Sequence, residues 1–170
     1  MPRFLFTVLA LTAFCLAGCQ SKNPLDWKIE ARSPEAFEVW LDRHQHLLPP
    51  DLQLQFGNAY AFLRNDTAVR IGATQPEKIA NQLCPRLHAK TIRAVILEAG
   101  QIEADATRLR ISTLVDNIAR NVKLSASLPD AATEKRFADQ RTAQAASIQT
   151  LRARIAEIDA QARQLSGGVR

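Results

Sequence analysis

The sequence predicts an all-α protein in which short N-terminal helices pack against a long, coiled-coil-like antiparallel helical hairpin. Three observations favour this fold class. Apolar residues recur every three or four positions over most of the chain after residue 33. Prolines and capping residues stand where these runs begin, and no alternation of apolar and polar residues persists long enough for a sheet. The last two runs are long and joined by a short polar loop, which is typical of antiparallel helices.

The first helix is predicted to begin at Pro34, with Ser33 as its N-cap, because proline is tolerated at the first helical position. Pro49-Pro50 should end this helix and open a second one, which we expect to fade over residues 65–72. The residues that share an apolar face in these two helices are Phe37, Trp40, Leu41, Leu47 and Leu48, then Leu52, Phe56, Ala59, Tyr60 and Leu63.

A short third helix should start at Pro76 and be limited by Pro85. Thr91 is predicted to cap the first long helix of the hairpin, and Asp130 the second, which Gly167-Gly168 ends. The expected core face of the first long helix comprises Ile92, Val95, Ala99, Ile102, Ala106 and Leu109, with a shift in register to Ile111, Val115, Ile118 and Val122.

The second long helix contains a candidate interaction seam. Ile148, Leu151, Ile155 and Ile158 alternate in steps of three and four, the pattern of a coiled coil. Either the preceding long helix or another chain covers this seam, and the pairing rule for antiparallel helices favours cover by residues 92–109 of the same chain. Polar residues, Arg141 and Gln144, occupy seam positions upstream, so we expect looser pairing there.

The first residues have the order of a secretory signal peptide. A cation at Arg3 precedes an apolar run over residues 4–16, which is too short to span a bilayer comfortably. The following Leu16-Ala17-Gly18-Cys19 resembles the lipobox of bacterial lipoproteins. This resemblance implies removal of residues 1–18 and acylation of Cys19, which would anchor the chain in a membrane because each buried methylene contributes about 0.8 kcal/mol.

The same resemblance implies a bacterial cell-envelope location. Gln20 follows the cysteine where an aspartate favours the inner membrane of enteric bacteria, so we expect the outer membrane, facing the periplasm. Residues 19–32 would then be a lipidated tether, in which we expect Trp27 and Ile29 to form a brief extended segment against the core. Residues 33–88 would form a short-helix region that makes one domain with the hairpin at 89–170.

A second resemblance covers about half of the remaining chain and rests on short motifs. The matching residues are Ser33, Glu35 and Phe37, then Leu48-Pro49, then Ala89-Lys90-Thr91. They are similar in kind and order to motifs of small bacterial lipoproteins of unknown function. The resemblance implies a helical fold and assigns no catalytic residue.

The formal net charge is +5 at pH 7, with basic and acidic residues interspersed. Export argues against nucleic acid as a partner and leaves anionic envelope components as counterparts. A basic cluster near a helix start, formed by Arg86, His88, Lys90 and Arg93, is a candidate anion-binding site. The alternative is that these cations are solvated surface residues.

Nothing in the chain predicts a metal, a cofactor or an enzyme. His44 and His46 point to different sides of a helix, and Pro85 lies between Cys84 and His88. Cys84 would be the remaining free thiol, either buried as a small apolar residue or bridged to a second chain. The sequence contains no G-x-S-x-G, glycine-rich phosphate loop or H-E-x-x-H.

These observations favour a membrane-anchored envelope lipoprotein whose non-catalytic helical domain is a structural or protein-interaction module. We expect its partner to be an unknown envelope protein or a second copy of the chain. The alternative function is binding of a small anionic ligand or envelope polymer through residues 86–93.

Overall fold

The computed structural model describes residues 23–127 and 130–167. The predicted signal peptide and Cys19 lie outside the described residues, as does Gly168. Helices make up most of the described chain and no strand is found in it, so the predicted all-α class is confirmed. Two compact units divide the chain between Val95 and Ile96, inside a helix.

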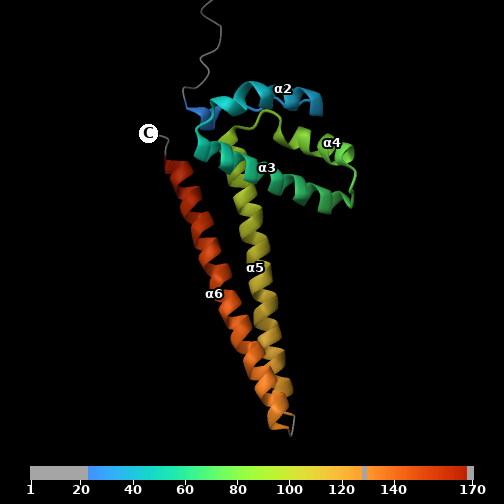
Figure 1. The fold of residues 1–170 in the computed structure, drawn as a ribbon, viewed down its shortest axis with the longest axis vertical. Coiled ribbons are helices and arrows are strands. Elements are labelled where there is room, and N and C mark those ends of the chain that lie inside the picture. The colour runs from blue at the N-terminus through green and yellow to red at the C-terminus, as the bar shows by residue number, and fades with distance from the viewer. Residues whose placement is uncertain (1–22, 128–129, 168–170) are drawn as a thin grey trace, which may run out of the picture. The chain divides into compact units, whose positions relative to one another are not determined.

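Figure 1 shows the order of the helices along the chain. They are η1 (Pro24–Asp26), α2 (Pro34–His44), η2 (Gln45–Leu47), α3 (Pro50–Ile71), α4 (Pro76–Leu87), α5 (Ile92–Ser125) and α6 (Ala131–Gly167). The first unit contains the elements up to the first four residues of α5, and the second contains the rest of α5 together with α6.

The core of the first unit contains three buried aromatic side chains among a larger number of aliphatic ones. The Ser33 hydroxyl accepts a hydrogen bond from the Ala36 N–H at 3.2 Å, which confirms it as the N-cap of α2. Phe37, Trp40 and Phe56 are buried, as predicted, and the Trp40 indole N–H donates to the Lys28 carbonyl at 3.0 Å. The prediction for Leu47 is wrong: α2 ends at His44, the chain tightens into η2, and this side chain is 56% exposed.

Part of the predicted tether belongs to the core, as expected for Ile29. Ile29 and Ala31 are fully buried. The Ile29 N–H donates to the Lys90 carbonyl at 2.8 Å, and its own carbonyl accepts from the Ala89 N–H at 2.9 Å. Ala89 adopts a left-handed backbone with φ of 63°, a conformation that favours glycine. The turn before α5 is therefore held by backbone pairing with residues 27–29.

Two predicted helix ends differ from the structure. The helix expected to fade from residue 65 continues to Ile71, where Gly72 caps it with φ of 61°. An ion pair between Arg70 and Asp66, one turn apart, supports the last turn. Pro85 lies inside α4, which continues to Leu87, because a proline in the last turn removes only one helical hydrogen bond.

The second unit is a hairpin in which α5 and α6 run antiparallel and side by side, as Figure 1 shows. Both predicted caps are confirmed. The Thr91 hydroxyl accepts from the Ala94 N–H at 3.1 Å, and the Asp130 carboxylate accepts from the Ala132 N–H at 3.0 Å. A hydrogen bond from the Thr133 hydroxyl lowers the pKa of the Asp130 carboxyl. These local caps fix where each long helix begins.

Candidate functional site: an incompletely packed helical hairpin

The structure engages the predicted basic cluster in bonds within the chain. Arg86 donates to the Asp66 carboxylate at 2.8 Å and to the Thr67 hydroxyl at 3.3 Å, and its side chain is 19% exposed. Arg93 donates to the Asp26 carboxylate at 3.0 Å and is 12% exposed. Each arginine therefore pairs with a different acidic residue of the first unit, and their charges are balanced locally.

The other two residues of the cluster help to hold the segment that precedes α2. The His88 Nδ1 atom accepts a hydrogen bond from the Ala31 N–H at 3.3 Å, so its neutral ring carries the proton on Nε2. The carbonyl of Lys90 accepts from the Ile29 N–H. These contacts give the predicted anion-binding residues structural roles.

Asp66 is the acidic centre of the contact between α3 and α4. Burial raises the pKa of this carboxyl, but hydrogen bonds from Arg86 and Arg70 outweigh burial and lower it below the usual value. Because the pKa of Asp66 is lower in the folded chain than its ordinary value of 3.8, this carboxyl stabilises the fold at pH values above 3.8. That contribution is lost as the pH falls through the depressed value.

Cys84 is buried in the first unit, with 3% of its surface exposed, and makes no disulfide. Burial raises the pKa of its thiol, which lowers the reactivity of the sulfur near neutral pH. Within the described residues, no three side chains of the histidine, cysteine, aspartate or glutamate types lie close enough to hold a metal ion.

His44 lies against the aromatic core. Its ring stacks on Trp40 at 4.6 Å between centroids and meets the edge of Trp27 at 5.4 Å. Its Nδ1 atom lies 2.8 Å from the Trp40 carbonyl, and since a carbonyl only accepts, that nitrogen carries the proton. His46 is exposed, whereas His44 is half-buried.

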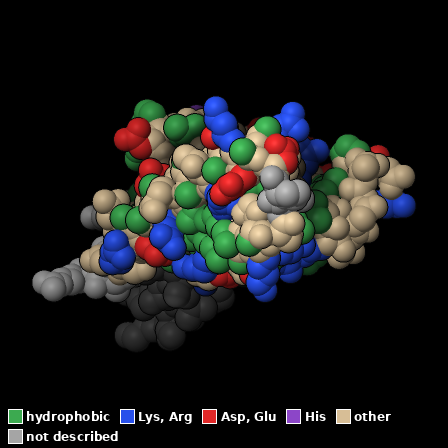
Figure 2. Space-filling model, turned by 90° about the horizontal axis from the view of Figure 1, so that it is seen from below, with side chains coloured by type: hydrophobic (Ala, Val, Ile, Leu, Met, Phe, Trp, Pro, Cys, Tyr) green, Lys and Arg blue, Asp and Glu red, His purple; other side chains and the backbone are tan. Residues whose placement is uncertain are grey.

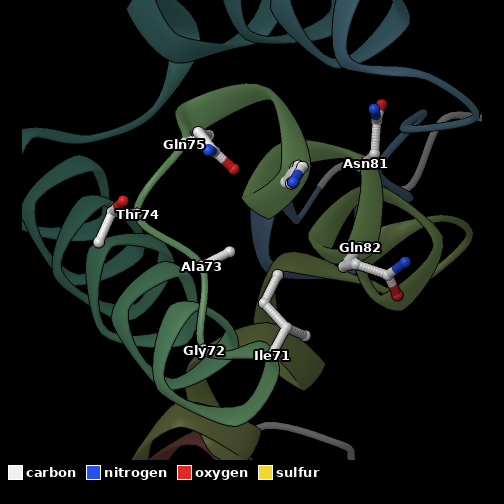
Figure 3. A pocket seen from close by; sticks show the side chains of 8 residues that line it. Ile71, Gly72, Ala73, Thr74, Gln75, Asn81 and Gln82 are labelled. Atoms are coloured by element: carbon white, nitrogen blue, oxygen red, sulfur yellow. The ribbon is translucent and has the colours of Figure 1, made fainter.

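A pocket of about 550 Å³ lies at the turn between α3 and α4. Figure 3 shows that its three amide side chains, from Gln75, Asn81 and Gln82, point in different directions. All three are exposed. Binding sites for small molecules bring polar groups together over an apolar floor, and this pocket does not.

The predicted seam of α6 faces α5. Ile148 and Ile158 are buried, and Leu151 and Ile155 are half-buried. A Cβ atom on Gly100 would lie 3.3 Å from Ile158 Cγ2, so the two helices approach closely at this glycine.

The predicted core face of α5 is confirmed at Ile92, Val95 and Ala99, which are buried. Beyond Ala99, the face that meets α6 differs from the predicted one. Arg154 forms a two-pronged ion pair with Glu103, with distances of 2.7 and 3.2 Å. Glu103 therefore faces α6, whereas Ala106 and Leu109, which we expected in the core, are exposed, Leu109 by 70%. Successive residues of a helix are rotated by about 100° about its axis. The face predicted from the apolar residues is therefore displaced by one residue from the face that meets α6.

The hairpin loses its packing toward its tip. Among residues 105–127 and 130–147, which we call the distal hairpin, no described side chain is buried. Val115, Val122 and Leu124 are 47 to 53% exposed.

The inner side of the distal hairpin is also polar, as the seam positions of Arg141 and Gln144 predicted. Arg141 donates to the Ser125 hydroxyl at 3.2 Å. Two buried amide atoms, Asn121 Nδ2 and Gln144 Oε1, have no hydrogen-bond partner. A buried polar atom left without a partner costs about 1–3 kcal/mol, so the pairing of the two helices is weak here.

In the face shown in Figure 2, Lys and Arg side chains are interspersed with acidic and uncharged ones. None of the described helices is both long and apolar enough to span a membrane.

Comparison with known proteins found no family model, no curated protein and no solved structure that matches this chain.

Proposed function

We propose that the protein is a membrane-anchored envelope lipoprotein whose distal hairpin is a docking surface for a protein. The observation that carries this proposal is the absence of any buried side chain among residues 105–127 and 130–147. The lipobox-like Leu16-Ala17-Gly18-Cys19 supports the anchor.

Packing arguments support a partner for the distal hairpin. Isolated helices are marginally stable in water, and most helical stability in proteins comes from burying an apolar face. Full burial of one Val, Leu or Ile side chain contributes about 1.5–3 kcal/mol. The distal hairpin contains Ile111, Leu114, Val115, Ile118 and Val122 and buries none of them fully. A partner that covers these side chains would supply the missing stabilisation.

The position of the anchor fits a module held close to a membrane. The described structure starts at Asn23, four residues after Cys19. An extended segment of this length spans at most about 14 Å. Acylation of Cys19 would therefore keep residues 23–95 beside the lipid surface. No observation favours the anion-binding alternative, because Arg86 and Arg93 are paired with Asp66 and Asp26.

A thiol-protection experiment tests the docking surface. In the full chain, we expect the thiol of Val122→Cys to react with a maleimide at least about tenfold more slowly in isolated envelopes than in dilute detergent-dispersed protein. A tenfold difference corresponds to about 1.4 kcal/mol of free energy by which the bound partner favours the buried thiol over the exposed one. The native Cys84 is 3% exposed and should stay unreactive in both samples.

The matched control is Val69→Cys, on the 82% exposed position of α3. Its thiol should react at similar rates in envelopes and in dispersed protein. If the thiol at position 122 reacts as fast in envelopes as in dispersed protein while the control also does, the distal hairpin is not covered and the proposed function is wrong.

A further inference from the structure

We propose that the loop between α2 and α3, residues 45–50, contacts the lipid surface to which the chain is anchored, with Trp27 beside it at the membrane interface. This inference rests on the anchor of the proposed function and names the face of the first unit that meets the lipid. It is carried by the exposed apolar side chains of the loop, by their place at the end of the unit where the described chain starts, and by the short segment that links this end to Cys19.

The loop is uncharged and largely apolar, yet it is exposed. Residues 44–50 contain no lysine, arginine, aspartate or glutamate, although these residue types make up 23% of the chain. Leu47 is 56% exposed, and Pro49 and Pro50 are also exposed. Because these residues are close neighbours in the sequence, they form one short apolar surface.

The fold holds this loop in a fixed conformation. Leu48 is only 6% exposed and fixes the loop to the core. Its N–H donates to the Gln45 carbonyl at 3.2 Å, and the Pro49 carbonyl accepts from the Gln53 N–H at 2.9 Å. The proline rings restrict the backbone further. Little conformational freedom is therefore lost when a lipid surface buries the exposed side chains.

The described chain starts beside this loop. Trp27, which follows η1, meets the ring of His44 edge-on at 5.4 Å between centroids, and η2 begins at the next residue after His44. Figure 1 shows η1, in blue, at the end of α2 from which the chain continues into α3. Asn23 directly precedes η1, so the described chain starts at the same end of the first unit as the loop.

The anchor limits how far this end can lie from the lipid. Four extended residues span at most about 14 Å, so an acylated Cys19 would hold Asn23 within that distance of the membrane surface. Attachment of this kind raises the local concentration of lipid around the loop, so that a small apolar surface suffices for contact. Trp27 is partly exposed, and tryptophan is enriched at membrane–water interfaces because its ring is apolar and its N–H is polar. The partner that the anchor brings to the loop is therefore lipid.

Apolar burial rather than charge drives this contact. Asp42 and Arg43 precede the loop and Asp51 follows it, while Lys28 follows Trp27. All four charged side chains are exposed, and two positive and two negative charges cancel. Neutral phosphatidylcholine is therefore a sufficient probe, because the surface has no excess of positive charge for anionic headgroups. A detergent micelle around the acyl chains covers the loop in the same way, so the contact is kept in detergent-dispersed protein.

A depth measurement in vesicles tests the inference. The anchored full chain with Leu47→Cys would carry a fluorophore on the new thiol and be reconstituted into phosphatidylcholine vesicles. Cys84 is 3% exposed and should stay unlabelled. We expect lipids with a nitroxide on the acyl chain to quench this fluorophore at least about twofold more than one on Val69→Cys, because interfacial apolar side chains lie about 5–10 Å into the boundary between headgroups and acyl chains.

Val69 is the matched control because it is 82% exposed and lies on the same helix that follows the loop. It is 19 residues beyond Pro50 in α3, which corresponds to about 28 Å along the helix axis. A fluorophore there should be equally accessible to water but far from the end of the unit that meets the lipid.

Tryptophan fluorescence gives a second measurement that needs no label. The chain contains two tryptophans, of which Trp40 is 5% exposed in the core. Brominated phosphatidylcholine should therefore quench the emission of the unmodified anchored chain, and Trp27→Phe should abolish most of this quenching.

The inference is overturned if the chain floats with the vesicles and position 47 is quenched no more than position 69, or if Trp27→Phe leaves the quenching by brominated lipid unchanged. A purified chain that does not float with the vesicles would overturn the anchor of the proposed function together with this inference. Because the vesicles contain no other protein, neither result depends on whether a protein covers the distal hairpin.

Discussion

Replacing Cys19 by serine is expected to leave the protein either uncleaved, with residues 1–18 attached, or released from membranes. The thiol is the acyl acceptor in the proposed anchor, and a hydroxyl at this position cannot form the thioether. Each methylene buried in the bilayer contributes about 0.8 kcal/mol, so losing two or three acyl chains removes nearly all of the affinity. Fractionation of cells, followed by mass measurement of the protein in each fraction, reports both effects.

The chain provides a matched control for this change. Cys15 lies within the predicted signal peptide, four residues before Cys19. The Cys15→Ser protein should be processed and anchored normally. A Cys19→Ser protein that remains with membranes at the size of the processed chain would contradict the lipoprotein proposal.

Ile158→Asp is expected to destabilise the hairpin by about 3 kcal/mol. Ile158 is 6% exposed and packs where Gly100 lets the two helices approach. The substitution places an unpaired carboxylate among apolar side chains and removes their packing. Thermal unfolding of the full chain in detergent, followed by circular dichroism, measures the loss of helix.

Leu109→Asp is the matched control, since it makes the same chemical change on the same hairpin. Leu109 is 70% exposed, so this substitution should alter stability by less than about 0.5 kcal/mol. Equal loss of stability in the two variants would mean that the side of α5 bearing Leu109 is packed and that the observed seam is wrong.

Local signals in the sequence predicted the helix starts well. Ser33, Thr91 and Asp130 each accept a hydrogen bond from a backbone N–H two or three residues later. These interactions depend on a few neighbouring residues, so the residue types reveal them. The apolar spacing of α6 likewise predicted its inner face, and the burial of Ile148 and Ile158 confirms that prediction.

Interactions between distant residues could not be predicted in this way. Arg86 and Arg93 were interpreted as a basic cluster because their partners, Asp66 and Asp26, lie 20 and 67 residues away. Beyond Ala99, which is buried as predicted, the inner face of α5 was missed for a related reason. That face includes Glu103, which forms an ion pair with Arg154 on the other helix of the hairpin. A charged residue at an inner position is not detected when the face is predicted from apolar residues alone.

Incomplete packing of the distal hairpin was visible in the sequence only in part. Arg141 and Gln144 at seam positions indicated weak pairing. The extent of that weakness emerged from the fold, in which no described side chain from residue 105 to residue 147 is buried. Alanine-rich segments such as residues 143–146 permit close helix contact but bury little apolar area.

Hydrogen exchange along the hairpin tests most directly whether a partner completes it. The full chain would be compared as a dilute detergent-dispersed monomer and in isolated envelopes, with exchange followed by mass spectrometry of peptides. We expect amides of the distal hairpin to exchange rapidly in the monomer, because few apolar contacts hold these helices together. In envelopes the same amides should be protected, while the protection of residues 29–95 stays constant. Equal exchange rates of the distal hairpin in the two samples would contradict the proposal that a partner covers it.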